Sequence, residues 1–309
     1  MKKAKATEIK AHEPLLDRIK TVALIAMVSN DELMDMLVLK GGNALHLVHK
    51  LSTRNSMDLD FSMEQDYFDG RIASIAGMLE QLLARHFAQI GLQVFDLELI
   101  KKPAQLPDPL KSFWGGYTLS YKLIEQDKFE GLKRDFDQLR RQAIRAEGKQ
   151  IFEIDFSPFE YTTPKQAVLV ENYTVYVYTP LMIVCEKLRA ICQQTDEYGQ
   201  VVGRQTKKSR PRDFYDIYYL VKKLNVDVIS PLGLDIIKHM FAVKQVALEI
   251  LGSLNSYRQL HAQNQTSLIN TVRVDSEILP FDEYFDFVNN LAREVLATIK
   301  EQSQVRLIP

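Results

Sequence analysis

The chain has 309 residues, enough for one large domain or two ordinary ones with a sizeable hydrophobic core. Hydrophobic residues make up 46% and charged residues 26% of the sequence, as is typical of a soluble globular protein. The 39 basic and 40 acidic residues leave a net charge of −1, so any nucleic-acid-binding surface would have to be a local basic patch.

The cysteines and the N-terminus indicate the compartment. Cys185 and Cys192 fall on one face of an expected helix, two turns apart, where they cannot form a disulfide within that helix. With no CxxC motif or histidine cluster nearby they do not predict a metal site, and they fit a reducing cytosol. The N-terminus lacks the apolar run of a signal peptide, and no stretch reaches membrane-spanning length. We expect a cytoplasmic protein with no membrane partner.

The first half of the chain mixes helical and strand patterns. Apolar residues recur at helical spacing over 15–37, and a short extended run then leads through a glycine turn into an expected helix. In chain order, the further expected helices are 44–51, 71–89 and a charged one near 128–147. The expected strands are 37–39, 57–61, 92–100, 116–124, 150–156 and 172–178.

After residue 180 the pattern becomes almost entirely helical up to 302, with breaks near 225–233 and 253–256 and a loop around 263–280. We therefore place a domain boundary at residue 180. Residues 1–180 are expected to form an α/β unit, and residues 181–309 a helical bundle.

The most informative local pattern is the strand that carries Asp58 and Asp60. Side chains alternate across a strand, so the two carboxylates share one face, while Met57, Leu59 and Phe61 share the other. Two such charges about 4 Å apart repel by about 1 kcal/mol in water and about 4 kcal/mol at an effective dielectric near 20. A partly buried pair needs a shared proton or a cation, and a divalent ion such as Mg²⁺ is the natural partner. Without other motifs, a solvated strand face would explain the pattern equally well.

A glycine turn lies shortly before this strand, in Lys40-Gly41-Gly42-Asn43. Glycines let the backbone approach a phosphate closely, and the N-terminus of the following helix offers free N–H groups. A tight strand-to-helix turn alone would also favour glycine. Next to a carboxylate strand, however, the turn predicts a phosphate cradle beside a metal site, as phosphoryl and nucleotidyl transfer require.

A third carboxylate is expected from the strand over residues 150–156, where Glu153 and Asp155 share one face. Either could complete the metal site or accept the proton of an attacking hydroxyl. We favour Asp155, with Glu153 as the reserve. An exposed strand face remains the alternative.

Four pieces of the sequence, in order, together resemble the AbiEii/AbiGii family, the nucleotidyltransferase toxins of bacterial abortive-infection and toxin–antitoxin systems. The pieces are Lys40-Gly41-Gly42-Asn43-Ala44-Leu45, Arg54-Asn55-Ser56-Met57-Asp58-Leu59-Asp60-Phe61, Glu186-Lys187-Leu188-Arg189-Ala190 and Arg210-Pro211-Arg212-Asp213-Phe214-Tyr215-Asp216-Ile217-Tyr218-Tyr219-Leu220. They span residues 38–220, and the last third of the chain resembles the family only as a helical region.

The resemblance implies an α+β fold, a polymerase-β-like nucleotidyltransferase with a mixed sheet and flanking helices, followed by a C-terminal helical bundle. It also implies a metal site and a nucleotide-binding site. The metal ligands would be Asp58, Asp60 and Asp155. The nucleotide-binding residues would be Lys40, Gly41, Gly42, Ser56, Lys187 and Arg212. Lys187 would contact the triphosphate, and Asp213 would belong to a second acidic motif.

The residues of the last two pieces also have simpler interpretations. Lys187 lies on the flank of the buried stripe of its helix, where it can reach a cleft or remain a solvated lysine. Arg212 and Asp216 have the spacing of a surface ion pair. Asp213 suits the first turn of a helix by charge alone.

Other candidates carry weaker signals. His46 and His49 could share one metal ion but lack further ligands, so surface or core positions are favoured. Trp114, followed by two glycines, could stack on a base or simply enter a strand. Two basic clusters could be solvated, or the second could track an RNA backbone beside the site. They are Arg140, Arg141, Arg145 and Lys149, and then Lys207, Lys208, Arg210 and Arg212.

These features together predict an enzyme that transfers a nucleoside monophosphate from an NTP to an acceptor hydroxyl, with Mg²⁺ (or Mn²⁺) as cofactor. The resemblance implies an RNA-modifying toxin, with the tRNA 3′ end as acceptor, a cognate antitoxin partner, and a role in growth arrest or phage defence. Two alternatives remain open. One is transfer to a protein or small-molecule hydroxyl, and the other is an inactive module that only binds RNA or a partner.

Overall fold

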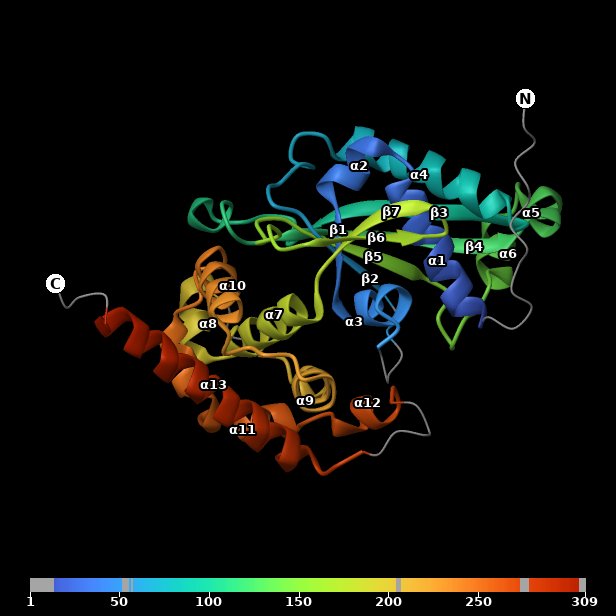
Figure 1. The fold of residues 1–309 in the computed structure, drawn as a ribbon. Helices are drawn as coiled ribbons and strands as arrows, with labels where there is room; N and C mark the ends of the chain where they lie inside the picture. The colour runs from blue at the N-terminus through green and yellow to red at the C-terminus, as the bar shows by residue number, and fades with distance from the viewer. Residues whose placement is uncertain (1–13, 52–55, 57, 204–206, 273–277, 306–309) are drawn as a thin grey trace.

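The computed structural model describes residues 14–51, 56, 58–203, 207–272 and 278–305. Met57, Arg54 and Asn55, which belong to the motif and strand expected from the sequence, lie outside these residues. Within the described chain, a mixed seven-stranded sheet carries helices on both sides, and most of the remaining helices gather at one side of it (Figure 1).

The sheet combines parallel and antiparallel pairs. From one edge to the other, its strands are β3 (Leu92–Lys102), β4 (Gly116–Glu125), β5 (Phe152–Ser157), β2 (Leu59–Ser62), β1 (Val38–Lys40), β7 (Tyr173–Val177) and β6 (Gln166–Val170). The pairs β2–β5 and β1–β7 are parallel, and the others are antiparallel. The α+β class is confirmed.

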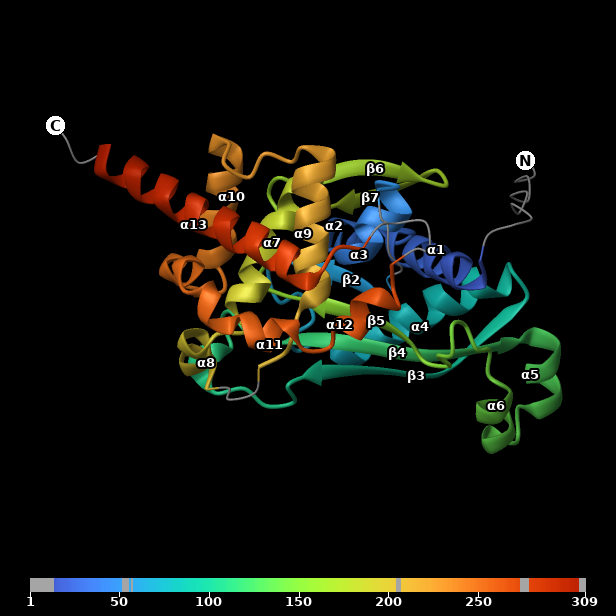
Figure 2. The same ribbon diagram turned by 90° about the horizontal axis from the view of Figure 1, so that it is seen from below.

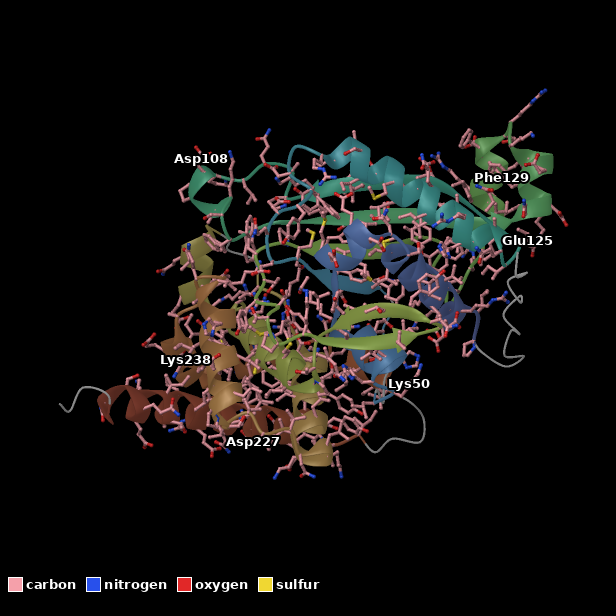
Figure 3. The ribbon with its side chains drawn as sticks, turned by 45° about the horizontal axis from the view of Figure 1, so that its top comes forward. Lys50, Asp108, Glu125, Phe129, Asp227 and Lys238 are labelled. Carbon is pink, nitrogen blue, oxygen red and sulfur yellow. The ribbon has the colours of Figure 1, made fainter. Side chains whose placement is uncertain are left out.

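The outermost long hairpin extends the sheet in both directions. Asp108, in the link between β3 and β4, lies at one end of the hairpin, and Glu125 and Phe129 lie at the other (Figure 3). The helix expected near 128–147 is wrong as a single element. It is two short helices, α5 (Gln126–Leu132) and α6 (Phe136–Gln142), because Asp135 caps a new N-terminus by accepting a hydrogen bond from the amide of Gln138.

Helix α4 (Ile72–Ala88) covers the face of the sheet opposite the C-terminal helices (Figure 1). Its apolar stripe is buried at Ile75, Leu79, Leu82 and Leu83, as the spacing predicts. The expected helix 15–37 is instead two helices, α1 (Leu15–Val28) and α2 (Asp31–Met36). Asn30 divides them, since its side chain caps α2 by accepting from the amide of Leu33.

The expected strands over the described residues are present with small shifts at their ends, whereas β6 was not predicted. Its five residues form a hairpin with β7 through Glu171 and Asn172, both at positive φ. Leu169 of this strand is 72% exposed, so the run lacks the regular buried face that marks the other strands.

From Pro180 onward the chain is helical. The helices are α7 (Pro180–Cys192), α8 (Asp196–Val202), α9 (Pro211–Leu224), α10 (Pro231–Ala242), α11 (Arg258–Ala262), α12 (Gln265–Ile269) and α13 (Phe281–Val305). Helix α13 packs against α9, and seen from below it crosses in front of the other helices of this part (Figure 2). One large hydrophobic cluster contains residues of both halves of the chain, and the division at residue 180 into two units stays a prediction.

Helix α7 begins directly after the sheet. Thr179 caps it by accepting from the amide of Met182, and Pro180 occupies its first turn. The amide of Tyr178 donates to the carbonyl of Leu39 in β1, which fixes the start of α7 beside the central strands. Across the helices of the described residues, none is both long enough and apolar enough to cross a membrane.

Candidate active site

A cleft of about 960 Å³ opens between the central strands and α7. Nearly all residues that the sequence singles out for the site line it. These are Lys40, Gly41, Gly42, Ser56, Asp58, Asp60, Glu153, Asp155, Lys187 and Arg212. Asp213 does not line the cleft but forms an ion pair with Lys187, which does. Segments from across the chain therefore meet at one place.

Asp60 and Asp155 lie side by side, because β2 and β5 are parallel and place these two residues in register. Burial raises the pKa of Asp60 to about 7, opposed by Lys40 and reinforced by the negative charges of Asp155, Glu186 and Asp58. Three acids thus act on one partly desolvated carboxyl group. A bound cation would reduce the repulsion between these negative charges and Asp60.

A hydroxyl on the neighbouring strand orients the second carboxylate. Thr118 of β4 is in register with Asp155, and its Oγ1 donates to Asp155 Oδ1 at 2.5 Å. Glu153 also lines the cleft, two residues earlier on the same face of β5. The register with Asp60 distinguishes Asp155 from Glu153, whose partner on β4 is Ser120.

Asp58 lies at the more exposed end of the group. Its Oδ1 is 3.2 Å from Nζ of Lys149, and its side chain is 36% exposed. The buried Asn43 side chain donates to the backbone carbonyl of Asp58 at 2.7 Å. This bond ties the glycine turn to the start of the carboxylate strand.

Carboxylate oxygens are the ligands that hard divalent cations prefer, so Asp58, Asp60 and Asp155 fit such an ion by chemistry. Among the described residues, no three acidic, histidine or cysteine side chains form a ready-made metal cluster. Asp58 is in part neutralised by Lys149. We infer that binding a cation here would require Asp58 to exchange Lys149 for the ion.

The glycine turn is shaped by Asp60. Gly41 begins the helical segment of α3 (Gly41–Asn43), which continues as a wider turn over Ala44–Val48. Its φ of +68° is in the left-handed region, and a Cβ added there would lie 2.9 Å from Asp60 Oδ2. A side chain at this position would be strained by the backbone and would press on the Asp60 carboxylate, so the turn favours glycine.

Lys187 is buried rather than solvated, with its side chain 5% exposed. Its Nζ lies 2.7 Å from Asp213 Oδ1 and 2.8 Å from Asp216 Oδ2, and Arg210 Nη1 lies 2.8 Å from Asp213 Oδ2. Burial would raise the pKa of Asp213, but Lys187 and Arg210 hold it well below its usual range. Two cations and two carboxylates thus form a balanced network.

The interpretation of Asp216 as a surface partner of Arg212 is wrong. Asp216 is 5% exposed and pairs with Lys187, whereas Arg212 is exposed and lines the cleft. The reason is that the side of α9 that carries Asp216 faces α7, where Lys187 lies.

Sequence reasoning missed a second buried network, around Glu160. Glu160 is 4% exposed and lies 3.1 Å from Arg189 Nη2, 3.5 Å from Lys40 Nζ and 3.5 Å from Lys244 Nζ. Burial alone would raise the pKa of Glu160, but these three cations outweigh it and lower the pKa to about 2. Its members come from four separate segments, so no local motif could reveal it.

The histidines, Trp114 and the basic clusters have different surroundings. His46 contacts Asp17 at 2.9 Å and His49 contacts the carbonyl of Tyr178 at 2.7 Å, so the two rings have different partners. Trp114 lines the cleft and packs on Tyr198. Of the basic clusters, Lys149, Lys208, Arg210 and Arg212 line the cleft, whereas Arg140 pairs with Asp96.

The cleft agrees with what sequence comparison finds. The model of the family described as nucleotidyl transferase AbiEii toxin, type IV TA system, matches residues 23–292. The matched range contains every residue that lines the cleft and every candidate residue named above. No significant match to a curated protein sequence is found.

Solved structures give distant likenesses. JHP933 from Helicobacter pylori has a TM-score of 0.45 and 16% identity, with 94% of each chain covered. The nucleotidyltransferase toxin MenT4 from Mycobacterium tuberculosis has a TM-score of 0.48 and 15% identity, covering 92% of this chain and 87% of that one.

Proposed function

Since the chain belongs to the AbiEii family of nucleotidyl transferase toxins of type IV toxin–antitoxin systems, we propose that it transfers a nucleoside monophosphate from an NTP to an RNA hydroxyl in an Mg²⁺-dependent reaction. The favoured acceptor is the 3′ end of tRNA. Family membership makes an NTP its substrate and an antitoxin its partner.

The observation that supports the proposal most strongly is the in-register pair Asp60 and Asp155, with Asp58 two residues away, at the wall of a cleft large enough for a nucleotide. Asp58, Asp60 and Asp155 would hold Mg²⁺ (or Mn²⁺). When bound, such an ion neutralises charge on the phosphates and favours ionisation of the attacking hydroxyl.

The protein's own groups position the reactants. The backbone of Gly41 and Gly42 and the hydroxyl of Ser56 line the cleft beside Asp60, where they can hold phosphate oxygens. Asp155, oriented by Thr118, would complete the metal site or accept the proton of the attacking hydroxyl. Catalysis then rests on in-line positioning and charge neutralisation, with no covalent protein intermediate.

Lys187 and Asp213 take a supporting role in this scheme. Because Asp213 and Asp216 both contact the ammonium group, Lys187 has less charge to offer a triphosphate than a free lysine would. We propose that Lys187 makes at most one contact to the nucleotide, and that Asp213 fixes its position.

Basic residues that line the cleft support an RNA acceptor. Lys208, Arg210 and Arg212 line the cleft from the segment before α9 and its first turn, and Arg212 is exposed. Cations beside a phosphoryl-transfer site can hold the backbone of an incoming strand, and such binding weakens with salt.

The test incubates the purified protein with Mg²⁺, each α-³²P-labelled NTP in turn, and total bacterial RNA. Label in a tRNA-sized band, absent for Asp58→Ala, is the expected result and also identifies the donor. Label in protein would contradict the RNA acceptor and point to transfer to a protein hydroxyl. No label with any NTP would contradict the proposal.

A further inference from the structure

Arg189 of α7 is a buried cation with unused hydrogen-bond donors. It is 2% exposed and lines the cleft. Its Nη2 contacts Glu160 Oε2 at 3.1 Å and Glu186 Oε1 at 3.3 Å, while Nε and Nη1 find no acceptor in the described part of the chain. Buried donors of a charged group are costly to leave unpaired, so this arrangement points to a ligand.

The surroundings of Arg189 carry excess positive charge. Lys40, Arg189 and Lys244 share Glu160, and Glu186 is a second acid at Arg189. Three cations thus face two carboxylates. The nearby network of Lys187, Arg210, Asp213 and Asp216 is balanced, so the surplus that could attract an anion belongs to the Glu160 cluster.

The lysines of this cluster are fixed in place. Lys244 Nζ donates to the carbonyl oxygens of Pro158 at 2.6 Å and Phe113 at 3.3 Å, in addition to its contact with Glu160. Its bonds are therefore used within the protein, and it supplies charge. The guanidinium group of Arg189, with its unpaired Nε and Nη1, supplies the donors.

The cluster borders the carboxylates of the cleft. Lys40 is the register partner of Asp60 across β1 and β2, and its charge acts on the Asp60 carboxyl. The α-phosphate of a donor nucleotide has to lie at the carboxylates, where transfer occurs. The β- and γ-phosphates of the donor are then the part within reach of the neighbouring cations.

We propose that Arg189 binds the β- and γ-phosphates of the donor NTP, and the pyrophosphate formed from them, with Lys40 and Lys244 supplying the surrounding charge. This assignment rests on the proposed function for the identity of the anion and for the place of its α-phosphate. In this assignment the leaving pyrophosphate is bound by the cations around Glu160 rather than by Lys187.

Isothermal titration calorimetry with Mg²⁺ tests this, using inorganic pyrophosphate, an NTP and the matching NMP as ligands. In Arg189→Gln, the Kd for pyrophosphate and for the NTP rises by about ten- to a hundredfold, as expected for loss of charged hydrogen bonds. The Kd for the NMP changes by less than about threefold, because the NMP lacks the two outer phosphates. Arg141→Gln, which is exposed and outside the cleft, leaves all three affinities unchanged.

Unchanged pyrophosphate affinity in Arg189→Gln, or an equal loss for the NMP, overturns the assignment. Should Arg189→Gln melt far below the wild type, Arg189→Lys replaces it. That variant keeps the charge beside Glu160 but loses the fork, and unchanged pyrophosphate affinity in it likewise overturns the assignment. A wild type that binds pyrophosphate through Arg189 yet transfers no label would contradict the proposed function and leave this site standing.

Discussion

Gly41 couples the backbone of the glycine turn to a carboxylate of the cleft. Its positive φ and the 2.9 Å approach of a Cβ to Asp60 Oδ2 both disfavour a side chain. We predict that Gly41→Ala loses about 1–2 kcal/mol of stability from the left-handed backbone. The added methyl group also displaces the Asp60 carboxylate, so the rate of nucleotide transfer falls as well. Urea unfolding and the labelled-nucleotide assay measure the two effects.

The matched control is Gly131→Ala. Gly131 lies in helix α5, with nothing within 4 Å of an added Cβ, so alanine there should be neutral or slightly stabilising. A Gly41→Ala variant as stable and active as Gly131→Ala would refute the steric account of the turn.

The carboxylates also predict metal binding at the residue scale. Asp60 and Asp155 each lose a charge on substitution with asparagine at nearly constant shape, and Mn²⁺ is a spectroscopic substitute for Mg²⁺. In electron paramagnetic resonance titrations in the presence of NTP, the affinity for Mn²⁺ should be at least about tenfold lower in either variant than in the wild type. Asp69→Asn, an exposed acid outside the cleft, should bind as the wild type does. Equal affinity for Mn²⁺ in all three variants would show that Asp60 and Asp155 are not metal ligands.

At the scale of elements, Glu160 connects the sheet to the helices. It follows β5, while its partners Lys40, Arg189 and Lys244 lie at the end of β1, in α7 and after α10. Glu160→Gln leaves three buried cations short of one carboxylate, and breaking a buried pair in this way costs about 3–5 kcal/mol. The control Glu130→Gln removes an exposed partner of Lys133 and should cost less than about 1 kcal/mol.

The stabilisation by Glu160 should depend on pH in a defined direction. Its pKa is lowered to about 2 in the folded protein, from an ordinary value of 4.5, so the unfolded chain binds the proton more tightly. The stabilisation is fully present above pH 4.5 and is lost as the pH falls toward 2. The stability difference between wild type and Glu160→Gln, followed by urea unfolding, should therefore shrink over this range. A difference that stays constant would contradict the charge-based account.

The same elements explain what could be predicted from sequence. The carboxylate strand and the glycine turn were found because their geometry is local: alternation fixes a face, and glycine pairs mark a turn. The partners of Lys187 and the Glu160 cluster were missed because each joins residues 26 or more positions apart through tertiary packing. Strand β6 was missed because none of its residues is buried, so its sequence does not alternate between apolar and polar residues as a half-buried strand does.

At the scale of the whole molecule, the cleft lies between the sheet and the helical part, and polar contacts of residues that line it join the two. Lys244 reaches the carbonyls of Phe113 and Pro158, and Arg189 reaches Glu160. A nucleotide bound there would contact both parts and stabilise the folded state by mass action, by about 2.7 kcal/mol at a hundredfold excess over Kd. We predict that an NTP with Mg²⁺ raises Tm by about 5–10 °C in differential scanning calorimetry. The corresponding nucleoside, as control, should leave Tm almost unchanged, and an equal rise with both would contradict a site built for phosphates.

The central claim is that the carboxylates of β2 and β5 carry out nucleotide transfer. Its most direct test is the single-turnover rate of label transfer from an α-³²P-labelled NTP to RNA by the wild type, Asp60→Asn and Asp69→Asn, with folding checked by circular dichroism. We predict that Asp60→Asn lowers the rate at least about a hundredfold, in line with the loss of a ligand to the cation that would neutralise transition-state charge. Asp69→Asn should retain the wild-type rate. A folded Asp60→Asn protein that transfers label as fast as the wild type would contradict the claim.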